Sequence, residues 1–232
     1  MYEQVSDLDY FKTLVADPDG IPLLEAAASL GVDAQPELDL QEVLSSVDVQ
    51  AQRLANRCVD VSTELSRLQA TVDFFYKELR FAGNINDYYS PDNSYLHKVI
   101  ETRRGIPISL AVLFVELARH VGLDAHGVSF PGHFLVTVNL HEGAVVLDPF
   151  TGKSLSGDEL HERFEPLRAH LATGGQGLVP LEQFLRVASP AEILLRMLNN
   201  LHHIFAQLGE HERLSRIDER IEVLKAALQD PA

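Results

Sequence analysis

The chain has 232 residues, 46% of them hydrophobic, and this length buries enough apolar surface to fold without disulfides. Thirty-four acidic residues against 19 lysines and arginines give a net charge of −15, which disfavours nucleic acid and anionic membranes as partners. One cysteine excludes an internal disulfide framework and a multi-cysteine zinc site. Neither a run of 18 apolar residues nor a signal-peptide pattern is present, so a cytoplasmic protein is expected.

The first third of the chain predicts helices throughout, because apolar residues recur with a helical period. Asp-Pro-Asp-Gly ends the first helix, Gly31 ends the second, and Ser62 or Thr63 can cap the fourth. Cys58 lies near the end of the third helix on its apolar stripe, which favours a small buried hydrophobic side chain over a reactive thiol. The predicted helices are 7–15, 23–30, 38–58 and 64–81.

A polar loop rich in asparagine, aspartate and tyrosine follows. It has two interpretations: a rim that contacts a peptide or small ligand, or a self-bonded loop that braces the next helix, and its capacity to bond its own backbone favours the second. Asn93 or Ser94 is expected to cap a short helix that ends at Gly105. The candidate binding residues here are Asn84, Asp87, Tyr88, Tyr89, Asn93 and Arg104, the last as a carboxylate clamp or an exposed helix-end cation.

Pro107 fits the first turn of a helix over 108–122 that is apolar around much of its circumference and therefore buried. After this helix the period of the apolar residues changes from 3.6 to 2. Strands are predicted at 125–130, 134–140 and 144–148, followed by a short helix at 156–164, a loop with some helix at 177–189, and two amphipathic helices at 190–207 and 210–228. The fold class is α+β, with an N-terminal helical region (1–82), a core with a central helix against a small antiparallel sheet (83–165) and a C-terminal helical region (166–232).

Two residues of this core suggest chemistry. His133 follows a Pro-Gly turn at the opening of one strand, and Asp148 closes the next, so neighbouring antiparallel strands can bring them together. Such a pair is the base and orienting half of a catalytic triad, or it is a structural pair that pins the hairpin. A cysteine nucleophile would sit at a helix N-terminus, but the facing helix opens with Gly105-Ile106-Pro107 and offers no sulfur.

The helix, the Gly-His strand and the Asp-Pro strand end resemble the transglutaminase-like branch of the papain-type superfamily. In that superfamily an alanine lies four residues, and a glycine fifteen residues, beyond the nucleophilic cysteine. Counting back from Ala111 and Gly122 puts this position at Pro107. The chain is also similar to the bacterial SirB-type family, whose transglutaminase-like core precedes tetratricopeptide-like helices. The stretches that carry this likeness are FAGNINDYYSPDNSYLHKVIETRRGIPISLAVLFVELARHVGL, FPGHFLVTV and LDPFTGKSL.

The resemblance implies a transglutaminase-like domain whose nucleophile is replaced by Pro107, acting as a peptide- or protein-binding module. The alternative is a hydrolase or amidase in which Ser109 or a bound water attacks, with His133 as base and Asp148 orienting it. Ser109 lies about 200° around the helix from Pro107, which disfavours it as the nucleophile. A purely structural module is a third, weaker hypothesis.

No cofactor is implied, because the chain contains no phosphate-binding loop and no paired-carboxylate motif. No metal site is expected either. Histidines 202, 203 and 211 lie on the last two helices, and no carboxylate or cysteine spacing completes a site with them.

Overall fold

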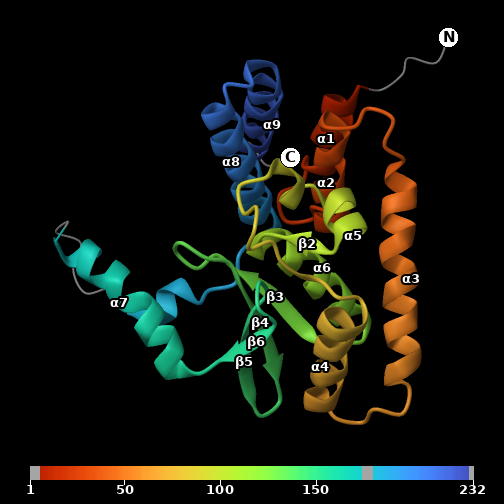
Figure 1. Cartoon of the computed structure of the whole chain (residues 1–232), viewed down its shortest axis with the longest axis vertical. Helices are drawn as coiled ribbons and strands as arrows, with labels where there is room; N and C mark the ends of the chain where they lie inside the picture. The colour runs from red at the N-terminus through yellow and green to blue at the C-terminus, as the bar shows by residue number, and fades with distance from the viewer. Residues whose placement is uncertain (1–5, 174–179, 230–232) are drawn as a thin grey trace.

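The computed structural model describes residues 6–173 and 180–229, and helices surround a small antiparallel sheet (Figure 1). The fold therefore combines helix and sheet, as the sequence predicts. The helices are α1 (Asp7–Leu14), α2 (Leu23–Ser29), α3 (Leu40–Cys58), α4 (Glu64–Val72), α5 (Leu96–Thr102), α6 (Pro107–His120), α7 (Gly157–Thr173), α8 (Pro190–Leu208) and α9 (His211–Gln229). The strands are β1 (Ala82–Gly83), β2 (Arg104–Gly105), β3 (Asp124–Val128), β4 (Leu135–Leu140), β5 (Gly143–Asp148) and β6 (Lys153–Leu155).

Helices α1, α3 and α4 begin where a polar side chain accepts hydrogen bonds from free backbone N–H groups, as Thr63 does for α4. The single helix predicted over 64–81 is wrong in its second half. Helix α4 ends at Val72 and continues as a π-helical turn, η2 (Asp73–Glu78). A π-turn shifts the phase of the helix, and both Phe74 and Phe75 are buried there.

Helix α5 corrects two further expectations. Neither Asn93 nor Ser94 caps it, because its first residue follows Tyr95, which makes no side-chain cap. It also ends before Gly105: Arg103 takes the left-handed conformation, with φ 60°, and its guanidinium lies 4.8 Å from the Phe81 ring centre. Gly105 instead belongs to β2, where an added Cβ would meet the Ser109 hydroxyl at 2.7 Å.

The central helix α6 begins at Pro107, as predicted, and is buried along most of its length against β3 and β4. The sheet is antiparallel, in the order β3-β4-β5-β6. Strand β6 was not predicted, because three residues are too short to display a period of two. It forms only because β5 offers an edge to pair with.

The C-terminal segments pack on the same core. Helix α7 extends well beyond the predicted 156–164, and a short 3-10 helix (Leu181–Phe184) occupies part of the loop predicted at 177–189, of which 177–179 lie outside the described residues. Helices α8 and α9 form a hairpin around Gly209, whose φ is 70°. A continuous hydrophobic cluster takes side chains from all three predicted regions, including Phe11, Val136 and Leu198. Within the ranges described, the helices are all too short or too polar to cross a bilayer.

Candidate functional site

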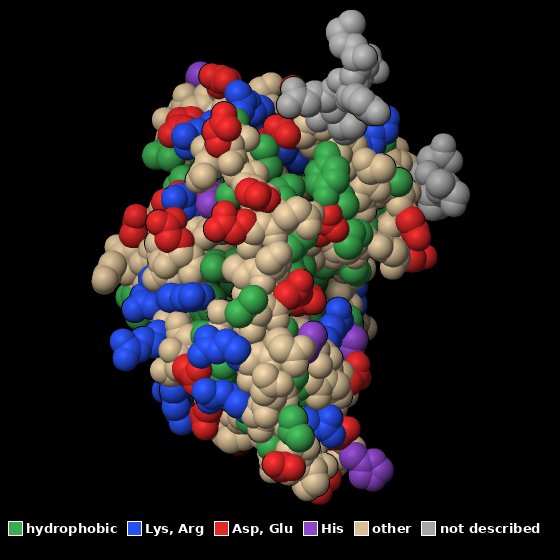
Figure 2. Space-filling model, turned by 90° about the vertical axis from the view of Figure 1, so that its right-hand side faces the viewer, with side chains coloured by type: hydrophobic (Ala, Val, Ile, Leu, Met, Phe, Trp, Pro, Cys, Tyr) green, Lys and Arg blue, Asp and Glu red, His purple; other side chains and the backbone are tan. Residues whose placement is uncertain are grey.

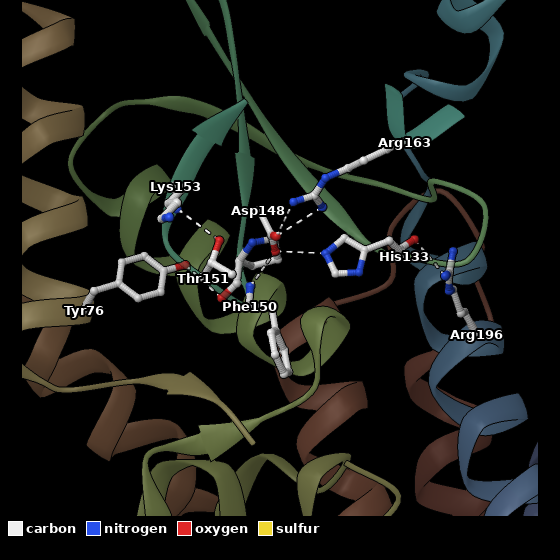
Figure 3. A network of polar contacts seen from close by, with 9 residues as sticks. Tyr76, His133, Asp148, Phe150, Thr151, Lys153, Arg163 and Arg196 are labelled. Carbon is white, nitrogen blue, oxygen red and sulfur yellow. Dashed lines mark hydrogen bonds and ion pairs between the residues drawn. The ribbon is translucent and has the colours of Figure 1, made fainter. Parts of the chain in front are cut away.

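The centre of the site is an ion pair between two strand ends. Asp148 is the last residue of β5, and His133 lies two residues before β4, after the turn in which Gly132 has a φ of 70°. Because β4 and β5 pair directly, the His133 Nε2 and Asp148 Oδ1 atoms approach to 2.9 Å (Figure 3). The sequence predicts both residues at the ends of neighbouring strands, and in the structure they meet at these ends.

Asp148 is buried, and both of its oxygens accept hydrogen bonds. Oδ1 accepts from the Phe150 backbone N–H at 2.9 Å as well as from His133, and Oδ2 accepts from both terminal nitrogens of Arg163 at 3.2 Å. Burial raises the pKa of this carboxyl group, but the hydrogen bond and charge of His133, the Phe150 N–H and Arg163 outweigh it and lower the pKa to about 2. Asp148 is therefore a carboxylate at neutral pH.

This ionised carboxylate fixes the imidazole of His133. A carboxylate only accepts hydrogen bonds, so Nε2 of His133 carries a proton and donates it. The other nitrogen, Nδ1, has no hydrogen-bond partner among the residues that the structure describes. Chemically, the pair is an oriented imidazole with one nitrogen available to a proton, a water or a ligand.

Arg196 on α8 holds the turn that carries His133. Its terminal nitrogens donate to the Ser129 hydroxyl at 2.9 Å and to the Phe130 carbonyl at 3.0 Å. They also donate to the His133 carbonyl at 2.8 Å (Figure 3). Sequence reasoning missed Arg196 and also Arg163. The sequence offered one signal for Arg196: it is the one basic residue in the mostly apolar run from 193 to 198. This signal does not reveal which distant residues Arg196 contacts.

A pocket of about 250 Å³ opens beside the imidazole. Pro107 and Ile108 from the start of α6 line it together with His133, while Arg196 and Asn200 on α8 line another side and Tyr88 reaches it from the polar loop. The residue that the resemblance puts at the nucleophile position thus shares a pocket with the imidazole. Cys58, the chain's single cysteine, lies on α3, and burial raises the pKa of its thiol.

Ser109 is not open to this pocket. Its side chain is fully buried, and its hydroxyl donates to the Asn93 carbonyl at 2.6 Å, with the Ile106 carbonyl at 3.1 Å as a second acceptor. The hydroxyl oxygen also accepts from the Ile106 N–H at 3.2 Å. The hydroxyl therefore joins the start of α6 to the polar loop.

The six candidate binding residues have different surroundings. Asn93 is buried and donates to the carbonyls of Asp87 and Tyr88 at 2.6 and 3.1 Å, while Asn84 donates to the Asn93 side chain at 2.9 Å. These bonds brace the loop. Tyr88 lines the pocket. The exposed Tyr89 packs edge-on against the Tyr88 ring, with 5.3 Å between the two ring centres.

Arg104, the sixth candidate, is occupied elsewhere. Its guanidinium donates to the carbonyls of Arg80 and Arg103 at 3.0 and 2.8 Å. It therefore links the residues just before β1 to those just before β2. It does not line the pocket beside His133. The carboxylate-clamp interpretation of Arg104 therefore has no support from its position.

Metal-binding groups are not gathered in the described ranges: no cluster of three or more histidine, cysteine, aspartate or glutamate side chains there could hold an ion. His202 pairs with Asp218 at 3.3 Å, and His203 contacts Gln207.

Comparison with known proteins gives a family and several relatives. A family model described as the transglutaminase-like superfamily matches residues 41–199. A UPF0162 protein of Xylella fastidiosa (strain Temecula1) is 37% identical over 206 residues, which is 88% of this chain and 72% of that protein. Human F-box only protein 21 is 30% identical over 179 residues, 73% of this chain and 26% of that protein. No solved structure matches the chain.

Proposed function

This chain belongs to the transglutaminase-like superfamily and to the UPF0162 family, and on that premise we propose that it is a non-catalytic binding module. Its pocket beside His133 holds a segment of a peptide or protein partner. The finer identification with the SirB-type family, including tetratricopeptide-like α8 and α9, is part of the same proposal.

One observation carries the proposal: Pro107 lines the pocket where the resemblance puts a cysteine, opposite an imidazole that is still held by Asp148, on a turn whose backbone is held by Arg196. Proline has no nucleophilic atom and no backbone N–H, so the reacting group of the family's chemistry is missing. The pocket, the oriented imidazole and the bracing contacts remain. These are the parts that binding needs.

The rim of the pocket suits a peptide. Tyr88 contacts Tyr89 and also approaches Phe150, with 5.9 Å between the ring centres of Tyr88 and Phe150, and Tyr89 is largely exposed. Aromatic side chains supply large contact areas at low entropic cost and are enriched where proteins bind peptides and proteins.

A hydrolase that activates water is the second candidate function. It is favoured by the open Nδ1 of His133, because an imidazole oriented by an ionised carboxylate is the arrangement of a general base. Ser109 fits the nucleophile role poorly, since its hydroxyl is buried and donates to a backbone carbonyl. Water remains the attacking species in this alternative.

Selection of a displayed random peptide library on the whole chain tests the binding function. Selected peptides are expected to bind at least tenfold more weakly to His133→Ala and Tyr88→Ala, and equally to a control, His203→Ala, which changes a surface histidine on α8. Isothermal calorimetry gives the affinities. Peptides that bind all the variants alike would show that the pocket is not the binding site.

A screen of amide and ester substrates separates the two functions. Non-catalytic binding predicts equal background rates for the wild type and His133→Ala. Turnover by the wild type that disappears in His133→Ala would establish the hydrolase instead. The screen needs no knowledge of the natural partner.

The proline position has its own chemical test. In a Cys58→Ser background, Pro107→Cys puts one thiol at the start of α6 beside His133, where an imidazole and the helix dipole favour the thiolate. Iodoacetamide at pH 6 is expected to alkylate it at least tenfold faster than it alkylates Cys58 in the wild type. Equal rates would mean that residue 107 does not face the imidazole in solution.

A further inference from the structure

The pocket beside His133 differs in charge from the chain as a whole. The chain carries a net charge of −15, yet the residues that line this pocket include one arginine and neither aspartate nor glutamate. Charge is unevenly spread elsewhere too: in the view of Figure 2, most lysine and arginine side chains lie in the lower half of the face. Net charge therefore does not set the local potential. The lining of this pocket carries the positive charge of an arginine, and Asp148, the carboxylate behind His133, is itself paired with Arg163.

The guanidinium of Arg196 carries the positive charge in the lining of this pocket. Its hydrogen-bond partners are neutral: the Ser129 hydroxyl and two backbone carbonyls. Other arginines, such as Arg163, Arg186 and Arg220, each bind a carboxylate, whereas no described acidic side chain forms an ion pair with Arg196. A half-buried cation without a counter-ion has lost part of its hydration, and an anionic ligand would compensate for that loss.

Further donors surround the same space. Asn200 lies one helical turn after Arg196 on α8, and both side chains line the pocket. The Tyr88 side chain lines the same pocket as Arg196 and can offer its phenol O–H there. Across the pocket, α6 begins at Pro107 with no acidic residue in its first turn, so no carboxylate of that turn neutralises its positive end.

We infer that the pocket recognises a single carboxylate of its partner, supplied by a peptide C-terminus or by an aspartate or glutamate side chain. This inference deepens the proposed function and rests on it for the nature of the partner. One arginine with amide and phenol donors matches a monoanion, whereas the chain's overall negative charge opposes polyanions.

Three small probes test the inference by NMR titration of the isotopically labelled whole chain. N-acetylphenylalanine has a main-chain carboxylate, N-acetylglutamic acid α-amide has a side-chain carboxylate, and N-acetylphenylalanine amide has none. Fragments of this size bind with dissociation constants of about 1 mM. At least one acid is expected to shift the signals of Gly132, His133 and Asn200, and the neutral amide is expected to bind at least tenfold more weakly. The two acids distinguish the two sources of carboxylate.

Arg196→Gln is expected to abolish the difference between acid and amide. Because Arg196 also holds the 129–133 turn, Asn200→Ala, which leaves that turn intact, is a second variant and is expected to weaken acid binding severalfold. Arg186→Gln is the matched control, since Arg186 lies outside the pocket and pairs with Glu192 at the start of α8. It should bind like the wild type.

The inference is overturned if the amide binds as tightly as the acids, or if no probe shifts pocket signals at about 50 mM, well above the expected constant. Failure of the proposed function looks different. Selected peptides that need His133 but bind equally with an amidated C-terminus and with asparagine and glutamine in place of every aspartate and glutamate would keep the binding function and reject the carboxylate. Acids that bind the pocket when no selected peptide does would keep the carboxylate and reject the peptide partner.

Discussion

Two carboxylates in this molecule form ion pairs between segments that are distant in sequence, and they differ in what surrounds them. Asp33 binds Arg220 of α9 through two nitrogens, at 2.6 and 2.9 Å. The Arg220 side chain is 2% exposed and lies over the Phe11 ring. Asp148 binds His133 and Arg163 with similar geometry, but the His133 side chain is 24% exposed and borders a pocket.

The difference separates structural from functional use of the same chemistry. The Asp33–Arg220 pair is nearly buried, with side chains 11% and 2% exposed, and joins the N-terminal region to α9. The Asp148–His133 pair is closed only on the Asp148 side, and Nδ1 of the imidazole is left without a described partner. An ion pair with one open face is the arrangement expected of a site.

Removal of Arg220 is expected to have the largest effect on stability. Arg220→Met leaves the Asp33 carboxylate nearly buried without its cation, and breaking a buried pair in this way costs about 3–5 kcal/mol. Urea denaturation measures the change. The Asp33→Asn, Arg220→Met double variant is expected to recover part of it, because no unpaired charge remains.

The matched control for this variant is Arg216→Met on the same helix, where an exposed pair with Glu212 contributes about 0.5 kcal/mol or less. Peptide binding at the His133 pocket should be unchanged in folded Arg220→Met. If binding fell together with stability, the two ion pairs would not be independent.

Replacement of Asp148 by Asn has the next largest expected effect. The folded pKa of about 2 lies below the reference value of 3.8, so the carboxylate contributes stability at pH values above 3.8 that is lost as the pH falls toward 2. The shift corresponds to about 2 kcal/mol at neutral pH. Asp148→Asn should remove that amount and flatten the stability profile between pH 4 and 2.

The Asp148 comparison needs a carboxylate that makes no such contacts. Asp60 is exposed in the turn after α3, and Asp60→Asn should leave both the stability and its acid dependence close to those of the wild type. Acid dependence unaltered by Asp148→Asn would show that other groups cause the loss of stability in acid.

Ser109→Ala tests whether this hydroxyl is structural. The change leaves the buried Asn93 carbonyl without its 2.6 Å donor and with only the Ile106 N–H at 3.4 Å, which costs about 1 kcal/mol. Ligand affinity at the pocket should not change, because the hydroxyl does not face it. Loss of affinity in a variant of nearly native stability would bring Ser109 back into the site.

The sequence predicted the parts of this site that depend on local signals. His133 and Asp148 each lie at the end of a period-two segment, and a short hairpin makes neighbours of such ends. Arg163 and Arg196 could not be found in this way. Both are on helices, and their roles depend on where α7 and α8 pack against the sheet.

The errors in the fold have the same origin. Asn93 is a good capping residue by type, but its amide is engaged by carbonyls of the polar loop, so α5 begins without it. Arg103 takes the conformation that favours glycine, and stacking on Phe81 compensates for the strain. In both cases a contact with another segment of the folded chain outweighs a local preference. That contact cannot be predicted from the sequence alone.

His97 gives the smallest expected effect and a third kind of polar group, one that is buried with neither ring nitrogen bonded by any described residue. Burial lowers its pKa from 6.5, nearby Lys98 lowers it further, and Asp92 and Glu101 oppose the shift. As the pH falls, the unfolded chain therefore binds a proton at this histidine before the folded chain does. The contribution of neutral His97 to stability is present above pH 6.5 and is lost as the pH falls below that value.

His97→Leu should change stability by less than about 1 kcal/mol at pH 7.5, because no hydrogen bond is lost. The wild type should lose stability relative to this variant between pH 6.5 and 5, whereas exposed His120→Leu should follow the wild type. Parallel profiles for wild type and His97→Leu would mean that the imidazole finds a partner in solution, and His97 would then resemble His133 rather than contrast with it.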